Sequence, residues 1–162
     1  MNKTQGPPPL DALEDLLNSD DRFHGVEHLD RTEGVHRINA RLGLAPGALG
    51  AGELVRLRDA LRSLIADPVD GATLTELAAT NPLRLSFEDD DVRLVADTAV
   101  GHVLSLVHRA AASGTWERLG VCRNPECQWI YYDASKNRSG RWCSTECSHV
   151  MRSRAYRARH AS

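Results

Sequence analysis

The first 121 residues of this 162-residue chain contain no cysteine, and all four cysteines fall between residues 122 and 147. The sequence also lacks an apolar run of about 18 residues, which excludes a transmembrane helix of ordinary length. Its first residues have neither the apolar segment nor the small-residue cleavage site of a signal peptide. We therefore expect a cytoplasmic protein that has no membrane association. In that compartment disulfides are disfavoured, and clustered cysteines indicate metal binding.

Catalytic patterns are missing as well. No Ser/His/Asp constellation, glycine-rich phosphate loop or pair of carboxylates at a catalytic spacing stands out. The hydrophobic content of 41% and the charged content of 26% are typical of a globular protein. We expect a binding protein rather than an enzyme, with one ordinary domain and a small appended module.

Charge divides the chain into two parts. Residues 115–162 hold nine Lys and Arg against four Asp and Glu, a net charge of +5, while the rest of the chain carries −7. An acidic body followed by a basic end suggests two parts with different partners.

The acidic part has the apolar spacing of helices. Residues 1–9 are expected to form a disordered leader, since three consecutive prolines favour polyproline II. Residues 10–114 are expected to form a helical domain, and residues 83–95 alternate as in a β-hairpin. Within this domain, helices are predicted over residues 10–21, 31–44, 53–67, 73–80 and 98–114. The predicted fold is mainly α with a small β-hairpin.

The cysteines form two close pairs, Cys122 with Cys127 and Cys143 with Cys147, and fifteen residues separate the pairs. Four thiolates at the corners of a tetrahedron, about 2.3 Å from the metal, need two such pairs on independent elements. The spacing therefore predicts one structural Zn²⁺, which leaves no open position for catalysis. Four reduced thiols or two disulfides are the alternatives.

The residues around the cysteines predict a treble-clef-like zinc finger over residues 115–162. "RNPE" favours a turn, "QWIYYD" a strand, and "ASKNRSG" a turning return. Cys143 and Cys147 are four residues apart, so they share one face at the start of a helix. Trp129 and Trp142 are expected to pack the finger. The finger has little apolar content of its own, so we expect it to need the metal in order to fold.

Cations gather near the second cysteine pair, in the preceding loop and on the predicted C-terminal helix. Guanidinium groups in such a setting suit phosphate contacts. The candidate nucleic-acid-binding residues are Lys136, Arg138, Arg141, Arg152, Arg154, Arg157 and Arg159. Two alternatives remain open. The basic helix could bind an acidic protein partner or the acidic body, or the cations could bind RNA while the aromatics of "WIYY" stack on unpaired bases.

At this point the sequence resembles the CGNR zinc finger. The similar features are the first cysteine pair followed by "QWIYYD", then "SKNRSGRWCS" and the arginine-rich "RAYRAR". The upstream segments "LNSDD", "TEGVHRINARLGL", "LRDALRSLIA" and "NPLRLSF" are similar to the ABATE domain that accompanies this finger in bacteria. Two features depart from the family. The signature reads Cys-Ser-His-Val at residues 147–150, and the second pair is spaced by three residues instead of four.

The resemblance implies a stress-responsive bacterial transcription regulator, associated with the nucleoid. Its finger would bind DNA, and its helical domain would sense a small-molecule effector or bind a partner. A single small finger has a modest footprint on DNA, so formation of a homodimer through the helical domain would enlarge it.

Overall fold

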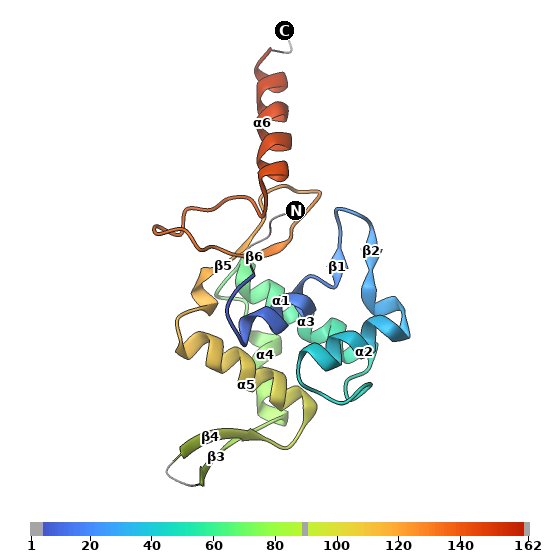
Figure 1. The fold of residues 1–162 in the computed structure, drawn as a ribbon, viewed down its shortest axis with the longest axis vertical. Helices are drawn as coiled ribbons and strands as arrows, with labels where there is room; N and C mark the ends of the chain where they lie inside the picture. Colours follow the sequence, from blue (N-terminus) through green and yellow to red (C-terminus); the bar gives the residue numbers. More distant parts are fainter. Residues whose placement is uncertain (1–4, 89–90, 161–162) are drawn as a thin grey trace.

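The computed structural model describes residues 5–88 and 91–160 and shows a mainly helical protein with small antiparallel strand pairs, as predicted (Figure 1). The helices are α1 (Leu10–Leu17), α2 (Thr32–Arg41), α3 (Ala51–Ala66), α4 (Ala72–Thr80), α5 (Ala99–Ala112) and α6 (Thr145–His160), with 3-10 turns η1 (His28–Asp30) and η2 (Trp116–Arg118). The strand pairs are β1 (Asp20–Asp21) with β2 (Val26–Glu27), β3 (Leu83–Glu88) with β4 (Asp91–Ala96), and β5 (Leu119–Val121) with β6 (Ile130–Tyr132). Among these described helices, none is long and apolar enough to cross a membrane.

Leucines build the core of the helical body. On α1 the side chains of Leu10, Leu13 and Leu17 are fully buried, and α3 contributes Leu54 and Leu61 in the same way. These positions recur every three, four or seven residues, which is the spacing of one helix face. Each buried leucine contributes about 1.5–3 kcal/mol relative to its exposed state. The leucine spacing of the sequence thus places α1 and α3 at the centre of the body.

The leader predicted for residues 1–9 differs from the structure in its described part, residues 5–9. The N–H of Gly6 is buried and donates to Oε2 of Glu14 at 2.7 Å, and the N–H of Leu10 donates to the carbonyl of Pro7 at 2.8 Å. The segment forms a turn against α1 because Glu14 offers it a buried acceptor. Residues 1–4 lie outside the described residues, as do residues 89 and 90 at the turn of the predicted hairpin.

The basic end of the chain packs on the body through its β5–β6 hairpin, which joins the leucine core. Asn18, directly after α1, donates to the carbonyl of Ile130 at 2.9 Å and accepts from its N–H at 2.8 Å. Arg62 on α3 donates to the carbonyls of Leu17 and Gln128, each at 2.7 Å. Ile130 is 1% exposed and belongs to the leucine core. The charge boundary at residue 115 is therefore not a packing boundary.

Glu14 lies where three segments meet: the N-terminal turn, α1 and β6. Its side chain is nearly buried and accepts backbone hydrogen bonds from Gly6 and Tyr132. Burial raises the pKa of Glu14 to about 7, and the negative charges of Asp15 and Asp11 add to this rise against the two hydrogen bonds. Glu14 therefore exchanges a proton near neutral pH at the junction between the body and the hairpin.

Candidate metal centre

The first cysteine pair lies in the turn of the β5–β6 hairpin. Val121 of β5 is paired with Ile130 of β6, and the N–H of Cys122 donates to the carbonyl of Trp129 at 2.9 Å. The sequence predicted a return after the "QWIYYD" strand, but the structure pairs β6 with the strand before the cysteines. Residues 133–142 instead form a loop without strand structure. The hairpin is only three residues long in each strand, so packing on α1 and α3 is what defines it.

The second pair flanks the start of α6. Cys147 lies in the first turn, and Cys143 precedes the first helical residue, Thr145. The prediction that both cysteines lie on the helix itself is therefore wrong for Cys143. Between them, Ser144 Oγ accepts the N–H of Cys147 at 3.2 Å, as an N-cap side chain does. Ser144 therefore marks the N-terminal end of α6, and Cys143 lies just before it.

All four sulfur atoms lie within 4.8 Å of one another, and all four side chains are buried. The Sγ atoms of Cys127 and Cys143 are 3.6 Å apart, and those of Cys143 and Cys147 are 3.8 Å apart. A zinc ion about 2.3 Å from each sulfur of a tetrahedron requires sulfur–sulfur distances of about 3.8 Å. A disulfide requires about 2.05 Å, so these pairs are not disulfides. The geometry fits one structural Zn²⁺ held by Cys122, Cys127, Cys143 and Cys147.

Hydrogen-bond donors surround the sulfurs. Asn124 is fully buried, and its Nδ2 donates to Sγ of Cys147 at 3.6 Å. Backbone N–H groups also bond the sulfurs of Cys122 and Cys127. Such donors orient metal ligands and stabilise their thiolate form. Trp129 and Trp142 pack against the cysteine cluster, which agrees with their predicted role.

Four thiolates this close would repel one another electrostatically. A hydrogen bond from Cys143 lowers the pKa of Cys127 to about 5, and the same contact, with burial, raises the pKa of Cys143. Burial also raises the pKa of Cys122. Buried thiolates this close are stable together only beside a cation, and a divalent zinc ion would supply that charge.

The structure separates the predicted phosphate-binding residues into two groups. Arg154 on α6 makes an ion pair with Glu126 of the cysteine turn, in which Nη2 donates to both carboxylate oxygens at 2.6 and 2.7 Å, and Arg138 pairs with Glu117 at 2.9 Å. The other five are exposed, and within the described part of the chain they make no ion pair: Lys136, Arg141, Arg152, Arg157 and Arg159. Arg123, between the first two cysteines, is also an exposed cation of the finger. It was not among the predicted phosphate-binding residues, although its position beside Cys122 is evident from the sequence.

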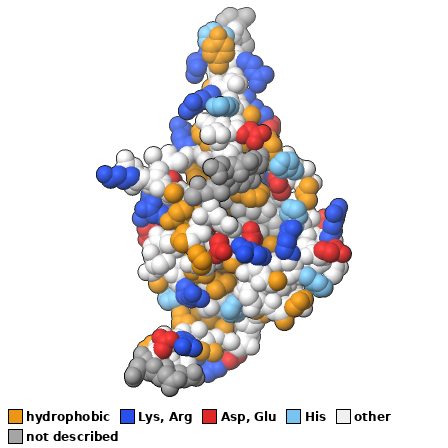
Figure 2. Space-filling view, in the orientation of Figure 1, with side chains coloured by type: hydrophobic (Ala, Val, Ile, Leu, Met, Phe, Trp, Pro, Cys, Tyr) orange, Lys and Arg blue, Asp and Glu red, His pale blue; other side chains and the backbone are white. Residues whose placement is uncertain are grey.

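α6 extends away from the rest of the molecule, and only its first turn is held by the cysteine cluster (Figure 1). Lys and Arg side chains lie along it and on the neighbouring loop (Figure 2). In this structure the basic helix therefore does not pack on the acidic body, which was one of the alternatives. Among the aromatics of "WIYY", Tyr131 is buried, Trp129 packs on the cysteines, and Tyr132 packs partly buried on the leucine core. RNA binding through these side chains remains a prediction.

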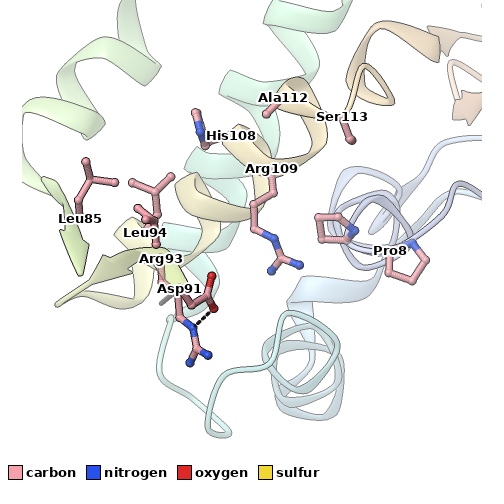
Figure 3. Close-up of a pocket in the computed structure, with 11 residues that line it drawn as sticks. Pro8, Leu85, Asp91, Arg93, Leu94, His108, Arg109, Ala112 and Ser113 are labelled. Atoms are coloured by element: carbon pink, nitrogen blue, oxygen red, sulfur yellow. Dashed lines mark hydrogen bonds and ion pairs between the residues drawn. The ribbon is translucent and has the colours of Figure 1, made fainter. Parts of the chain in front are cut away.

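A hollow of about 900 Å³ lies on the helical body between α5 and the β3–β4 hairpin (Figure 3). Arg109 of α5 reaches toward it, and the Asp91–Arg93 ion pair lies on its hairpin side. Leu85 and Leu94 supply part of its apolar lining, and Pro8 and Pro9 of the N-terminal turn border it as well. The hollow is far along the molecule from α6, and the effector that the sequence predicted remains a prediction.

Comparison with known proteins supports the assignment of the cysteine region. Residues 118–160 match the family model of the CGNR zinc finger, so this segment of the chain is similar to that finger. A search of curated proteins finds no match to the chain. The family match covers the hairpin, the cysteines and α6 but not the helical body, whose similarity to the ABATE domain remains a prediction.

Proposed function

We propose that the zinc finger binds duplex DNA through α6 and the loop before it, and that the chain is a transcriptional regulator. The helical body would then bind the effector or protein partner that regulates it. The exposed cations of α6 carry this proposal. Arg152, Arg157 and Arg159 stand on a helix that the zinc site holds at one end only, and no acidic side chain of the described residues pairs with them.

The dimensions of α6 suit a DNA groove. Its 16 residues give a length of about 24 Å, and the major groove, about 12 Å wide, admits an α-helix. At 100° per residue, Arg152 and Arg159 lie on one flank of the helix and Arg157 lies on another. A helix in the groove would therefore present guanidinium groups to the phosphates on both sides.

The Arg154–Glu126 ion pair supports the same arrangement in another way. It joins α6 to the turn that carries Cys122 and Cys127, about two helical turns beyond Cys147, the cysteine on α6. Both groups are partly exposed, so the pair contributes little to stability. The pair would favour one direction of α6 relative to the cysteine turn.

The proposal predicts a change in the salt dependence of binding when the three free arginines of α6 are replaced together by alanine. If each contacts one phosphate, the slope of log K against log salt should become less steep by about 2.7, since each contact releases about 0.9 counterion. Fluorescence anisotropy of zinc-loaded protein on a labelled duplex, at several salt concentrations, measures this slope.

The matched control removes three arginines from elements of the helical body that lie away from α6 (Figure 1): Arg84 of β3, Arg93 of β4 and Arg109 of α5. It changes the net charge equally and should leave the slope close to that of the wild type. Equal slopes for both triple variants would contradict the role of α6. A folded, zinc-loaded wild type that fails to bind duplex even at low salt would favour the protein-interaction alternative.

A further inference from the structure

The loop between β6 and the second cysteine pair, residues 133–142, is a second cationic arm of the finger. It projects sideways from the base of α6 and has Lys or Arg side chains on it (Figure 1, Figure 2). Lys136 is exposed in this loop, and Arg141 is exposed at its end. The loop has no regular secondary structure, so its shape depends on the hydrogen bonds that close it.

The side chain of Asp133 closes the loop at its base. One carboxylate oxygen accepts the N–H of Ser135 at 2.9 Å, and the other accepts the N–H of Gly140 at 2.7 Å. The hydroxyl of Tyr131 donates to the carbonyl of Gly140 at 2.7 Å. The peptide groups of Gly140 are thus held from both sides, by Asp133 and Tyr131, and this set of contacts is called the loop clamp below.

Further contacts fix the chain inside the clamp. Arg118 donates to the carbonyls of Asp133 and Ser135, at 3.1 and 3.2 Å. The N–H of Ser139 donates to the hydroxyl of Ser135 at 3.2 Å. A Cβ at Gly140 would lie 2.8 Å from Oδ2 of Asp133, so the close approach of the carboxylate to this peptide requires glycine.

We propose that Asp133 is a positioning residue for nucleic-acid binding: its loop clamp holds Lys136 and the neighbouring cations as a rigid second arm that contacts the phosphate backbone beside α6. This inference rests on the proposed function. The clamp lowers the conformational entropy that the loop must lose when it binds. A carboxylate in a phosphate-binding surface would by itself weaken binding, so its place there is explained by the hydrogen bonds that it accepts.

Asp133→Asn separates these two effects, because they have opposite signs. The variant removes a negative charge, so electrostatics alone predicts tighter binding to DNA. It also replaces one acceptor oxygen by an NH₂ group, which cannot accept the N–H of Ser135 or of Gly140. The clamp therefore predicts weaker binding, by roughly threefold to tenfold if one or two residues lose their fixed conformation. Gly140→Ala opens the same clamp without a change in charge and should also weaken binding.

The test measures duplex binding by anisotropy for the full chain loaded with zinc, and confirms zinc content and thermal stability for each variant. Asp133→Asn is then combined with Lys136→Ala, and separately with Arg152→Ala. If Asp133 acts through the loop, its effect shrinks when Lys136 is already absent and stays unchanged when Arg152 is absent. A role in the fold alone would leave both combinations additive.

Three outcomes decide the inference. Weaker binding by both clamp variants, with coupling to Lys136, supports it. If the wild type binds duplex and the zinc-loaded clamp variants bind it as tightly as the wild type or more tightly, the clamp is overturned. The proposed function is then unaffected. A zinc-loaded wild type that does not bind duplex overturns both.

Discussion

Replacing Cys143 by serine is expected to release zinc and unfold α6, while the leucine core of the helical body stays folded. The buried cluster at the base of α6 consists of the four cysteines and Tyr131, and Phe23, Trp129 and Trp142 pack against it partly buried. Most of its buried side chains are therefore the metal ligands themselves. A structural zinc site contributes about 10–16 kcal/mol in small fingers. A helix of 16 residues that is held at one end only is marginal by itself in water.

Zinc content per chain and amide hydrogen exchange measure this result. Exchange should become fast over residues 143–160 and stay slow in α1 and α3. Ser148→Ala is the matched control, since Ser148 lies next to Cys147 and is not a ligand. A Cys143→Ser chain that keeps one zinc ion and a protected α6 would show that the other three sulfurs are sufficient.

The second large effect is expected at Glu14, whose replacement by glutamine should stabilise the protein above neutral pH. The pKa of Glu14 rises from 4.5 to about 7 on folding, mainly because the carboxylate is buried. A raised folded-state pKa means that the native state binds the proton more tightly than the unfolded state does. The stabilisation from Glu14 is therefore complete below about pH 4.5 and is lost as the pH rises through about 7.

Glutamine stays neutral, so it avoids this loss and still offers one acceptor oxygen to Gly6 or Tyr132. One pKa unit corresponds to about 1.4 kcal/mol, and partial access of water reduces the total. We expect Glu14→Gln to exceed the wild type by about 1–3 kcal/mol in free energy of unfolding near pH 8 and to lose this advantage toward pH 5.

Urea denaturation of both chains across this pH range measures the difference. Both chains have the same four cysteines, so the pH dependence of the zinc site cancels in the comparison. Glu33→Gln, at an exposed carboxylate of α2, is the control and should show no such trend. A difference between Glu14→Gln and the wild type that does not depend on pH would mean that Glu14 is ionised throughout.

The parts of the fold that follow from local sequence were predictable. Leucines at helical spacing predicted α1 and α3, and alternation predicted the β3–β4 hairpin. The cysteine spacing predicted the cluster because a tetrahedral thiolate site constrains where its ligands occur in the sequence. These features have a periodicity or a residue spacing that can be recognised in the sequence without knowledge of tertiary contacts.

The parts that depend on long-range contacts were missed. The β1–β2 pair has two residues in each strand, too few for a periodic pattern. The β6 strand was predicted within "QWIYYD", but its pairing with the three-residue strand β5 was not. Asn18 bonds both backbone groups of Ile130, 112 residues away, and nothing near Asn18 in the sequence indicates this. The helix predicted for residues 10–21 ends at Leu17, just before this contact. The pairing of Arg154 with Glu126 likewise depends on the zinc site bringing two distant segments together.

The zinc-dependence of duplex binding tests the account most directly. Anisotropy of a labelled random duplex would be recorded with zinc-loaded protein, after addition of a chelator, and after zinc is restored. We predict binding that weakens steeply with salt, disappears on chelation and returns with zinc, because the metal holds α6 and the loop in place. Binding that is unchanged by complete removal of zinc, or absent while zinc is bound and the protein folded, would contradict the account.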